Sequence, residues 1–164
     1  MDEAQRRQRN ADRLAECHPK FGDRMKAVIG ALEAQSFRPR IQEGWRSEAD
    51  QLKAFNSGHS KLKFGYHNAT GKNGEKEALA VDLLDDDAPL NPSVRYLLAL
   101  AVAARGQQLQ TGLKWGLPDT LAKAIEDAIV ARAIDAPMSK VGWDPCHVEI
   151  TGLTVDEVKA GKRP

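Results

Sequence analysis

The stretch Ala78-Leu-Ala-Val-Asp-Leu-Leu84 decides the fold, because it is a compact apolar run with a single charged residue, Asp82, inside it. Its length and apolar character predict a buried β-strand, which the acidic run 85–87 and Pro89 bring to an end. A carboxylate in a buried strand is costly unless it is paired or bound to a metal. Asp82 is therefore the first candidate functional residue. The alternative is an Asp that is hydrogen-bonded to nearby backbone amides.

Helices and further short strands are predicted on both sides of this run. Apolar residues at helical spacing begin at Phe21, and Ser47 and Ser93 are typical helix N-caps. The predicted elements are helices over 21–34, 47–55, 94–110 and from Asp119 or Thr120 to 134, strands over 37–41, 111–115 and 147–150, and a short helix after Thr154. Strands that alternate with helices and long loops predict an α+β domain.

Composition narrows the class of protein. The chain has 164 residues, which fits one domain, and a formal net charge of +1, which gives no electrostatic footprint for nucleic acid. The longest apolar run, 97–104, is too short to span a bilayer, so no membrane anchor is expected. Two cysteines cannot make a disulfide scaffold, and Cys17 and Cys146 are expected to be free thiols, with Cys146 in the core.

The N-terminal region is charged and Ala-rich over residues 2–16, which predicts a helix or a frayed arm, and His18-Pro19 interrupts it. We therefore expect a helical arm over 1–18 and one domain over 19–164. No apolar run follows the basic residues at the N-terminus, so we expect no secretory signal peptide and synthesis in the cytoplasm.

Two of the four histidines lie in informative places. His67 ends a loop rich in Gly, Lys and Asn, where a histidine is ordinarily solvated. His147 lies in a predicted strand, in which residues two apart share a face, so His147 and Glu149 are expected to point the same way and Val148 into the core. A hydrolytic zinc site needs three protein ligands, for which zinc prefers His nitrogen, carboxylate oxygen and thiolate, and an open position for water. Taken singly, none of these residues is specific.

Taken in order along the chain, the motifs resemble a known pattern. They are Ile41-Gln-Glu-Gly-Trp-Arg-Ser47, Gln51, Asn56-Ser-Gly58, Tyr66-His-Asn68, Ala80-Val-Asp-Leu83, Gly112-Leu-Lys-Trp-Gly116 and Trp143-Asp-Pro-Cys-His-Val-Glu149. On these motifs the sequence resembles the zinc peptidases of the D-alanyl-D-alanine carboxypeptidase and L-alanyl-D-glutamate endopeptidase group, including phage endolysins. The resemblance covers residues 19–150. It implies a hedgehog/DD-peptidase-like fold, a single domain with a small antiparallel sheet flanked by helices.

The resemblance also implies a role for each matched residue. It implies one Zn²⁺ per chain, held by His67, Asp82 and His147. It implies that Asp144, three residues before the last histidine, is the general base, and an Asp at this position points to the endopeptidase side. It implies that Arg46 helps to stabilise the oxyanion. The ordinary alternatives are a surface salt bridge for Arg46 and a turn residue for Asp144.

Substrate contacts are expected from three further residues, Tyr66, Gln51 and Glu149. For Glu149 two other roles stay open, because it could orient a zinc-bound histidine or replace Asp144 as the base. Trp115 is expected in the core rather than against substrate, and His59 is expected to be a solvated loop residue. The implied partner is a peptidoglycan stem peptide, bound by a monomer.

Three departures from the family pattern stand out. Fourteen residues lie between His67 and Asp82 where the family has six, and the surplus around Asn73-Gly74 predicts an inserted hairpin. Gly65 stands where the family often has Ser. The segment 117–142 is longer than a minimal member needs, and we expect a lid or an added substrate wall there.

The expected function is that of a zinc-dependent peptidoglycan peptidase of the endolysin type, which cuts the L-Ala–D-Glu bond and reaches the wall after holin-type release. A D-Ala-D-Ala carboxypeptidase is the alternative enzyme. A non-catalytic, zinc-stabilised binding module is the alternative from another class. The presence of Asp144 and Arg46 argues against that module, because a structural site needs neither a base nor an oxyanion partner.

Overall fold

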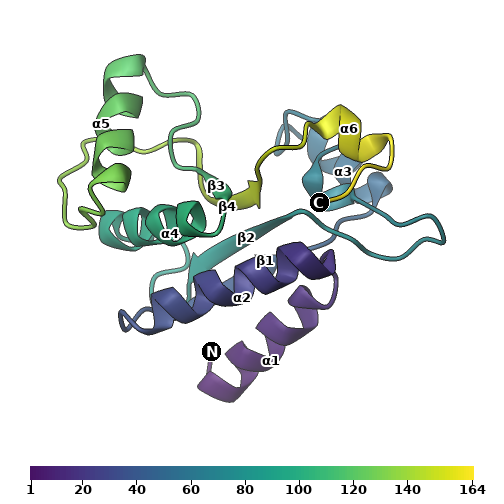
Figure 1. The fold of residues 1–164 in the computed structure, drawn as a ribbon, viewed down its shortest axis with the longest axis horizontal. Coiled ribbons are helices and arrows are strands. Elements are labelled where there is room, and N and C mark those ends of the chain that lie inside the picture. The colour runs from purple at the N-terminus through teal and green to yellow at the C-terminus, as the bar shows by residue number, and fades with distance from the viewer.

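The apolar run around Asp82 forms the second strand of an antiparallel sheet in a computed structural model that describes residues 1–164. The sheet has the spatial order β1-β2-β4-β3, so β2 and β4 are its central strands. Its strands are β1 (Pro39–Glu43), β2 (Ala80–Asp85), β3 (Leu109–Gly112) and β4 (Asp144–Ile150). The helices are α1 (Glu3–Leu14), α2 (Pro19–Glu33), α3 (Glu48–Asn56), α4 (Val94–Gly106), α5 (Asp119–Val130) and α6 (Val155–Lys159), with a 3₁₀ turn, η1, at Tyr66–Asn68. This is the single α+β domain that the sequence predicts (Figure 1).

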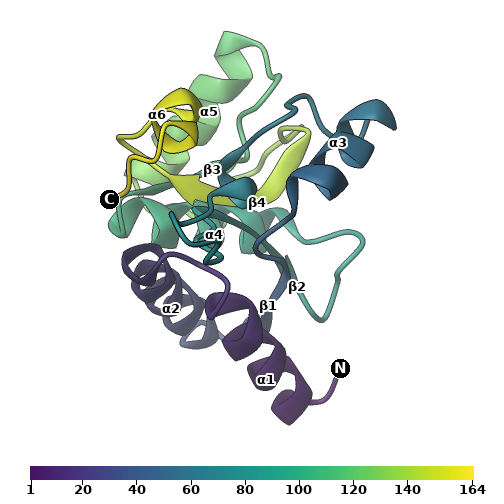
Figure 2. The ribbon, with the colours of Figure 1, turned by 90° about the vertical axis from the view of Figure 1, so that its right-hand side faces the viewer.

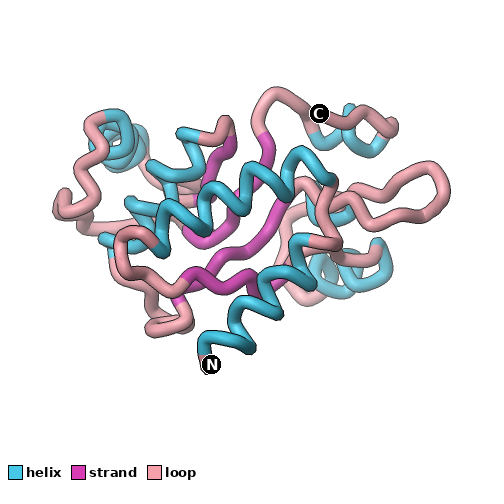
Figure 3. Tube along the Cα trace, turned by 60° about the horizontal axis from the view of Figure 1, so that its bottom comes forward, coloured by secondary structure: helices cyan, strands magenta, loops and turns pink.

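The two faces of the sheet have different environments because side chains alternate along each strand. Val81 and Leu83 of β2 and Val148 of β4 join the hydrophobic core with α2 and α4. Asp82 and His147 point to the other face. The N-terminal helices lie across the strands in Figure 3, and Figure 2 shows α3 on the other side of β2 from α2. The apolar face of the sheet therefore packs into the hydrophobic core, and the polar side chains lie on the opposite face.

Helix α1 packs along the edge strand β1. Arg6 donates to the carbonyl of Pro39 at 2.6 Å, and Asn10 donates to the same oxygen at 2.9 Å. The amide of Ile41 donates to Asn10 Oδ1 at 2.7 Å. Helix α1 therefore covers an open sheet edge, and the division into an arm and a domain at residue 18 stays a prediction.

The limits of several elements differ from the predicted ones. Strand β2 runs from Ala80 to Asp85 rather than over 78–84, and β4 begins at Asp144 rather than 147. Strand β1 begins at Pro39 rather than 37, and α4 ends at Gly106 rather than 110. Gln108 takes a left-handed conformation (φ 56°) that reverses the chain, so β3 begins at Leu109 and ends before Trp115. Helix α5 has Pro118 at its N-cap and stops at Val130 rather than 134. In each case tertiary packing sets an end that local propensity leaves open.

Other predictions about local structure are confirmed. Ser47 caps α3 through the amide of Asp50, and a β-bridge pairs Thr70 with Lys76 around the predicted turn. Cys17 and Cys146 are buried and free. None of the helices is long and apolar enough to cross a membrane.

Candidate metal centre

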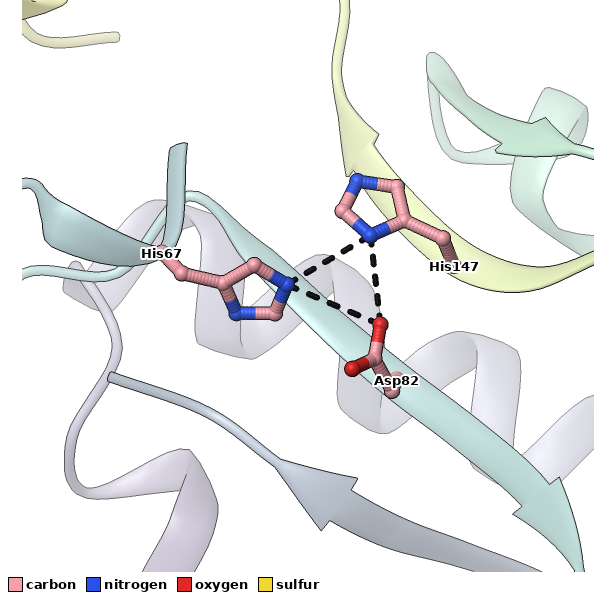
Figure 4. A group of neighbouring side chains, drawn as sticks. All are labelled: His67, Asp82 and His147. Atoms are coloured by element: carbon pink, nitrogen blue, oxygen red, sulfur yellow. Dashed lines mark hydrogen bonds and ion pairs between the residues drawn. The ribbon is translucent and has the colours of Figure 1, made fainter. Parts of the chain in front are cut away.

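Three side chains from separate segments meet on the polar face of the sheet (Figure 4). Asp82 of β2 and His147 of β4 are direct cross-strand partners, so their side chains point to the same side. His67 comes from η1, which leads through the hairpin loop into β2. The inserted hairpin carries the surplus residues away from the sheet, and the chain still returns with His67 beside Asp82. The predicted ligand set is therefore brought together in the fold.

The distances in this cluster fit a tetrahedral metal. His67 Nε2 lies 3.4 Å from His147 Nδ1 and 3.6 Å from Asp82 Oδ1, and the latter two atoms are 3.2 Å apart. Tetrahedral zinc, with bonds of about 2.0–2.1 Å, separates its ligand atoms by about 3.4 Å. The three atoms thus form one face of a zinc tetrahedron, which leaves a fourth corner for water or substrate.

Hydrogen bonds on the far side of each imidazole fix which nitrogen faces the centre. His67 Nδ1 lies 2.6 Å from the carbonyl of Gly44, which can only accept, so Nδ1 carries the proton and Nε2 has a free lone pair. His147 Nε2 lies 2.9 Å from Glu149 Oε2, which in the same way leaves Nδ1 free. Gln110 of β3 donates to the other oxygen of Glu149 at 2.6 Å. Both rings are therefore held in the tautomer that binds a metal.

The charges of the cluster favour a cation at its centre. Burial lowers the pKa of His147, but its hydrogen bonds with Asp82 and Glu149 outweigh burial and raise that pKa to about 9. Burial raises the pKa of Asp82, yet its bonds with His147 and His67 hold it well below the ordinary value. A positive charge between these side chains is therefore stabilised, and a divalent metal satisfies all three lone pairs at once.

Asp144 stands next to the centre, with its Oδ2 4.0 Å from His147 Nδ1. Burial and the charge of Asp82 raise its pKa, which suits a carboxylate that takes up a proton. Its backbone is fixed by the close approach of Gly112, where an added Cβ would lie 2.1 Å from the carbonyl oxygen of Asp144. Only glycine fits at that position without moving Asp144.

Arg46 lies on the other flank, held by two side chains. It donates from Nε to Glu43 at 2.8 Å and from Nη1 to Gln51 at 2.9 Å, and Nη2 bonds the second oxygen of Glu43. The Glu43 bond raises the pKa of Arg46 against the effect of burial, and the charges of Asp82 and Asp144 add to it. Three of the five guanidinium N–H groups are used, which leaves two for a ligand.

These residues line a cleft of about 380 Å³. Its walls include the three ligands, Asp144, Arg46 and the three predicted substrate contacts, together with Trp115, Trp143, Gly65 and residues 59–62. Gln51 is buried, and both ends of its amide are bonded within the protein. Tyr66 donates its hydroxyl to the carbonyl of Leu153 at 2.5 Å. Whether any of them contacts substrate stays a prediction.

The placement of Trp115 in the core is wrong. Strand β3 ends at Gly112 after an irregular register, so the chain turns and Trp115 lies against His147, with ring centroids 5.1 Å apart. The sequence did not single out Gly44 or Gln110. The carbonyl of Gly44 accepts from His67, and Gln110 donates to Glu149, which accepts from His147. The register Gln110–Glu149 could have indicated the second pair, had the start of β3 been placed correctly.

Comparison with models of known protein families and with curated proteins gives no match. Among solved structures, the fold is similar to the crystal structure of the L-Ala D-Glu endopeptidase ChiX from Serratia marcescens. The TM-score is 0.51 and the identity 22%, over 87% of this chain and 86% of that one. A likeness at this identity establishes the shared α+β fold, in agreement with the fold class predicted from the sequence.

Proposed function

We propose that the protein is a zinc-dependent peptidase that hydrolyses the L-Ala–D-Glu bond of peptidoglycan stem peptides. The observation that carries the proposal is the triangle of His67 Nε2, Asp82 Oδ1 and His147 Nδ1, whose edges of 3.2–3.6 Å match a zinc tetrahedron with one open corner. The fold shared with ChiX, itself an L-Ala D-Glu endopeptidase, supports the choice of substrate.

The residues around the open corner have complementary roles in this reaction. Zinc, when bound by these ligands, supplies a Lewis acid that polarises a carbonyl and makes water a nucleophile near neutral pH. Asp144 takes the proton of the attacking water and passes it to the leaving amine. Arg46 offers its two unused N–H groups to the carbonyl oxygen as negative charge develops there. Glu43 and Gln51 hold that guanidinium in place.

The test is a digest of purified peptidoglycan followed by mass spectrometry of the fragments. We expect new D-Glu amino termini, loss of activity with a chelator, recovery on adding zinc, and no activity in His147→Ala. Release of terminal D-Ala alone would establish the carboxypeptidase instead. A protein that holds stoichiometric zinc and cleaves no muropeptide would be a binding module.

We further infer that the enzyme acts as an endolysin. Support comes from the resemblance to the endolysin branch, in which Asp stands at the position of Asp144. The test is expression without an export signal in a Gram-negative host. Cells are expected to stay intact until chloroform or a holin opens the membrane, and then to lyse within minutes. Lysis without membrane opening, or none after it, would contradict this role.

A further inference from the structure

Lys61 and Arg46 are the lysine and the arginine that line the cleft, and of these two only Lys61 has no acidic partner. Arg46 pairs with Glu43. His59 makes a hydrogen bond instead, with its Nδ1 2.8 Å from Ser57 Oγ. Lys61 forms no ion pair, and its Nζ lies 4.6 Å from the centroid of the Trp143 ring. This contact joins the loop after α3 to the residue before Asp144, so an exposed positive charge lines the same cleft as Asp144 and the three candidate ligands.

The loop that carries Lys61 is clamped on both sides by one buried side chain. Gln51, which is 3% exposed, donates from Nε2 to Ser60 Oγ at 2.8 Å and to the carbonyl of Leu62 at 2.6 Å. Its Oε1 accepts from Arg46. The two residues that flank Lys61 are thus tied through Gln51 to the guanidinium of Arg46, which holds the backbone of Lys61 at the edge of the cleft.

Lys61 offers an anionic group of a ligand a positive charge that no carboxylate of the protein pairs with. Asp82, Asp144 and Glu149 also line the cleft and repel a carboxylate, and Arg46 is already paired with Glu43. An unpaired ammonium at the rim attracts one. We propose that Lys61 binds a free carboxylate of the substrate next to the scissile bond. On the proposed function, on which this inference rests, that group is the α-carboxylate of D-Glu on the leaving-group side.

The experiment compares two stem peptides that differ only in this group, one with the free D-Glu carboxylate and one with its carboxamide. The wild type is expected to prefer the acid by about tenfold in kcat/KM, since a hydrogen bond to a charged group contributes on that scale. Lys61→Met should lose the preference by raising KM for the acid, and Lys61→Arg should keep it. Lys63→Met is the matched control, because Lys63 lies over Phe55 and outside the cleft.

Binding to the Asp144→Asn variant separates this inference from the proposed function. Trp143 lies under Lys61, so tryptophan fluorescence can follow titration with each peptide without turnover. Tighter binding of the acid that disappears when Lys61→Met is added supports the inference even if neither peptide is ever cleaved. Equal binding of both peptides, or equal losses from Lys61→Met and Lys63→Met, would overturn it, even in an enzyme that cleaves L-Ala–D-Glu.

Discussion

Helix α1 and the candidate metal centre both remove charged or polar side chains from solvent, and they differ in how these groups are satisfied. In α1, Arg6 is 2% exposed and donates to Glu3, Glu33 and a backbone carbonyl. Asn10 is 5% exposed, and its oxygen and nitrogen both bond β1. Each side-chain nitrogen of these two residues has an acceptor.

At the metal centre, by contrast, the outer atoms are satisfied and the inner atoms converge. The imidazoles of His67 and His147 use their far nitrogens on Gly44 and Glu149, and their near nitrogens face each other and Asp82. Two imidazole nitrogens and a carboxylate oxygen that point at one spot favour a positive charge between them, which a proton on His147 or a metal ion can supply. The difference teaches that a closed polar cluster supports the fold, whereas an open one marks a binding site.

The substitution Asp144→Asn is expected to have the largest effect, on kcat, and it tests the contrast between the cleft and α1. If Asp144 is the general base, as proposed, its loss should lower kcat by about 10²–10⁴-fold, with zinc content unchanged because no proposed ligand is removed. Burial and the charge of Asp82 raise the pKa of Asp144, so the ionised group is unfavourable in the folded protein. The metal-free variant should therefore unfold at the same or a higher Tm at pH 7. Kinetics, metal analysis and thermal melts measure the three quantities. A lower Tm would show that the Asp144 carboxylate stabilises the folded protein, as the buried side chain of Arg6 does.

A smaller effect is expected from Glu149→Gln, which weakens the outer support of His147. Loss of such a partner typically lowers metal affinity about 10–100-fold, which a chelator competition measures. Glu48→Gln is the control, since Glu48 is exposed and does not line the cleft. Equal zinc affinity in the two variants would show that Glu149 does not orient the ring and would reopen its role as a substrate contact.

Asn10→Ala tests the polar contacts between α1 and β1. It leaves the buried amide of Ile41 without an acceptor, so the free energy of unfolding should fall by about 2 kcal/mol, as measured by urea denaturation. Zinc affinity should stay within about twofold of the wild type. Gln8→Ala, on the exposed side of α1, should change neither quantity. A fall in zinc affinity as large as that of Glu149→Gln would erase the distinction between the two regions.

The sequence predicted the candidate metal ligands, His67, Asp82 and His147, better than the buried polar residues of α1, Arg6 and Asn10. The reason is physical. Asp82 in an apolar run and His147 two residues before Glu149 follow strand periodicity, and a cross-strand register brings them together. Arg6 and Asn10 lie in a segment rich in charge, where nothing local separates a buried polar residue from a solvated one. Their burial depends on the edge of β1, more than 25 residues away.

Within the cleft, two findings that the sequence did not predict also depend on tertiary contacts. The substrate contact of Gln51 stays a prediction, and its amide also clamps the loop 60–62 to Arg46. Trp115 was placed in the core because a strand was predicted to run through it. The bend at Gly112, forced by the approach of Asp144, turns Trp115 toward the cleft. Close backbone approach between distant segments leaves no periodic signal in the sequence.

The smallest expected effect is the acid response of α1, and it follows from Glu3. Hydrogen bonding to Arg6 lowers the pKa of Glu3 from its ordinary 4.5 to about 2, with burial opposing. A lowered pKa stabilises the fold fully above pH 4.5, and this stabilisation is lost as the pH falls from 4.5 to 2. Glu3→Gln should therefore be less stable than the wild type at pH 6, and the two should converge near pH 2. Because Glu3 is exposed at the surface, 1 M salt should shrink the gap at pH 6, whereas the loss in Asn10→Ala, which involves no charge, should not respond to salt.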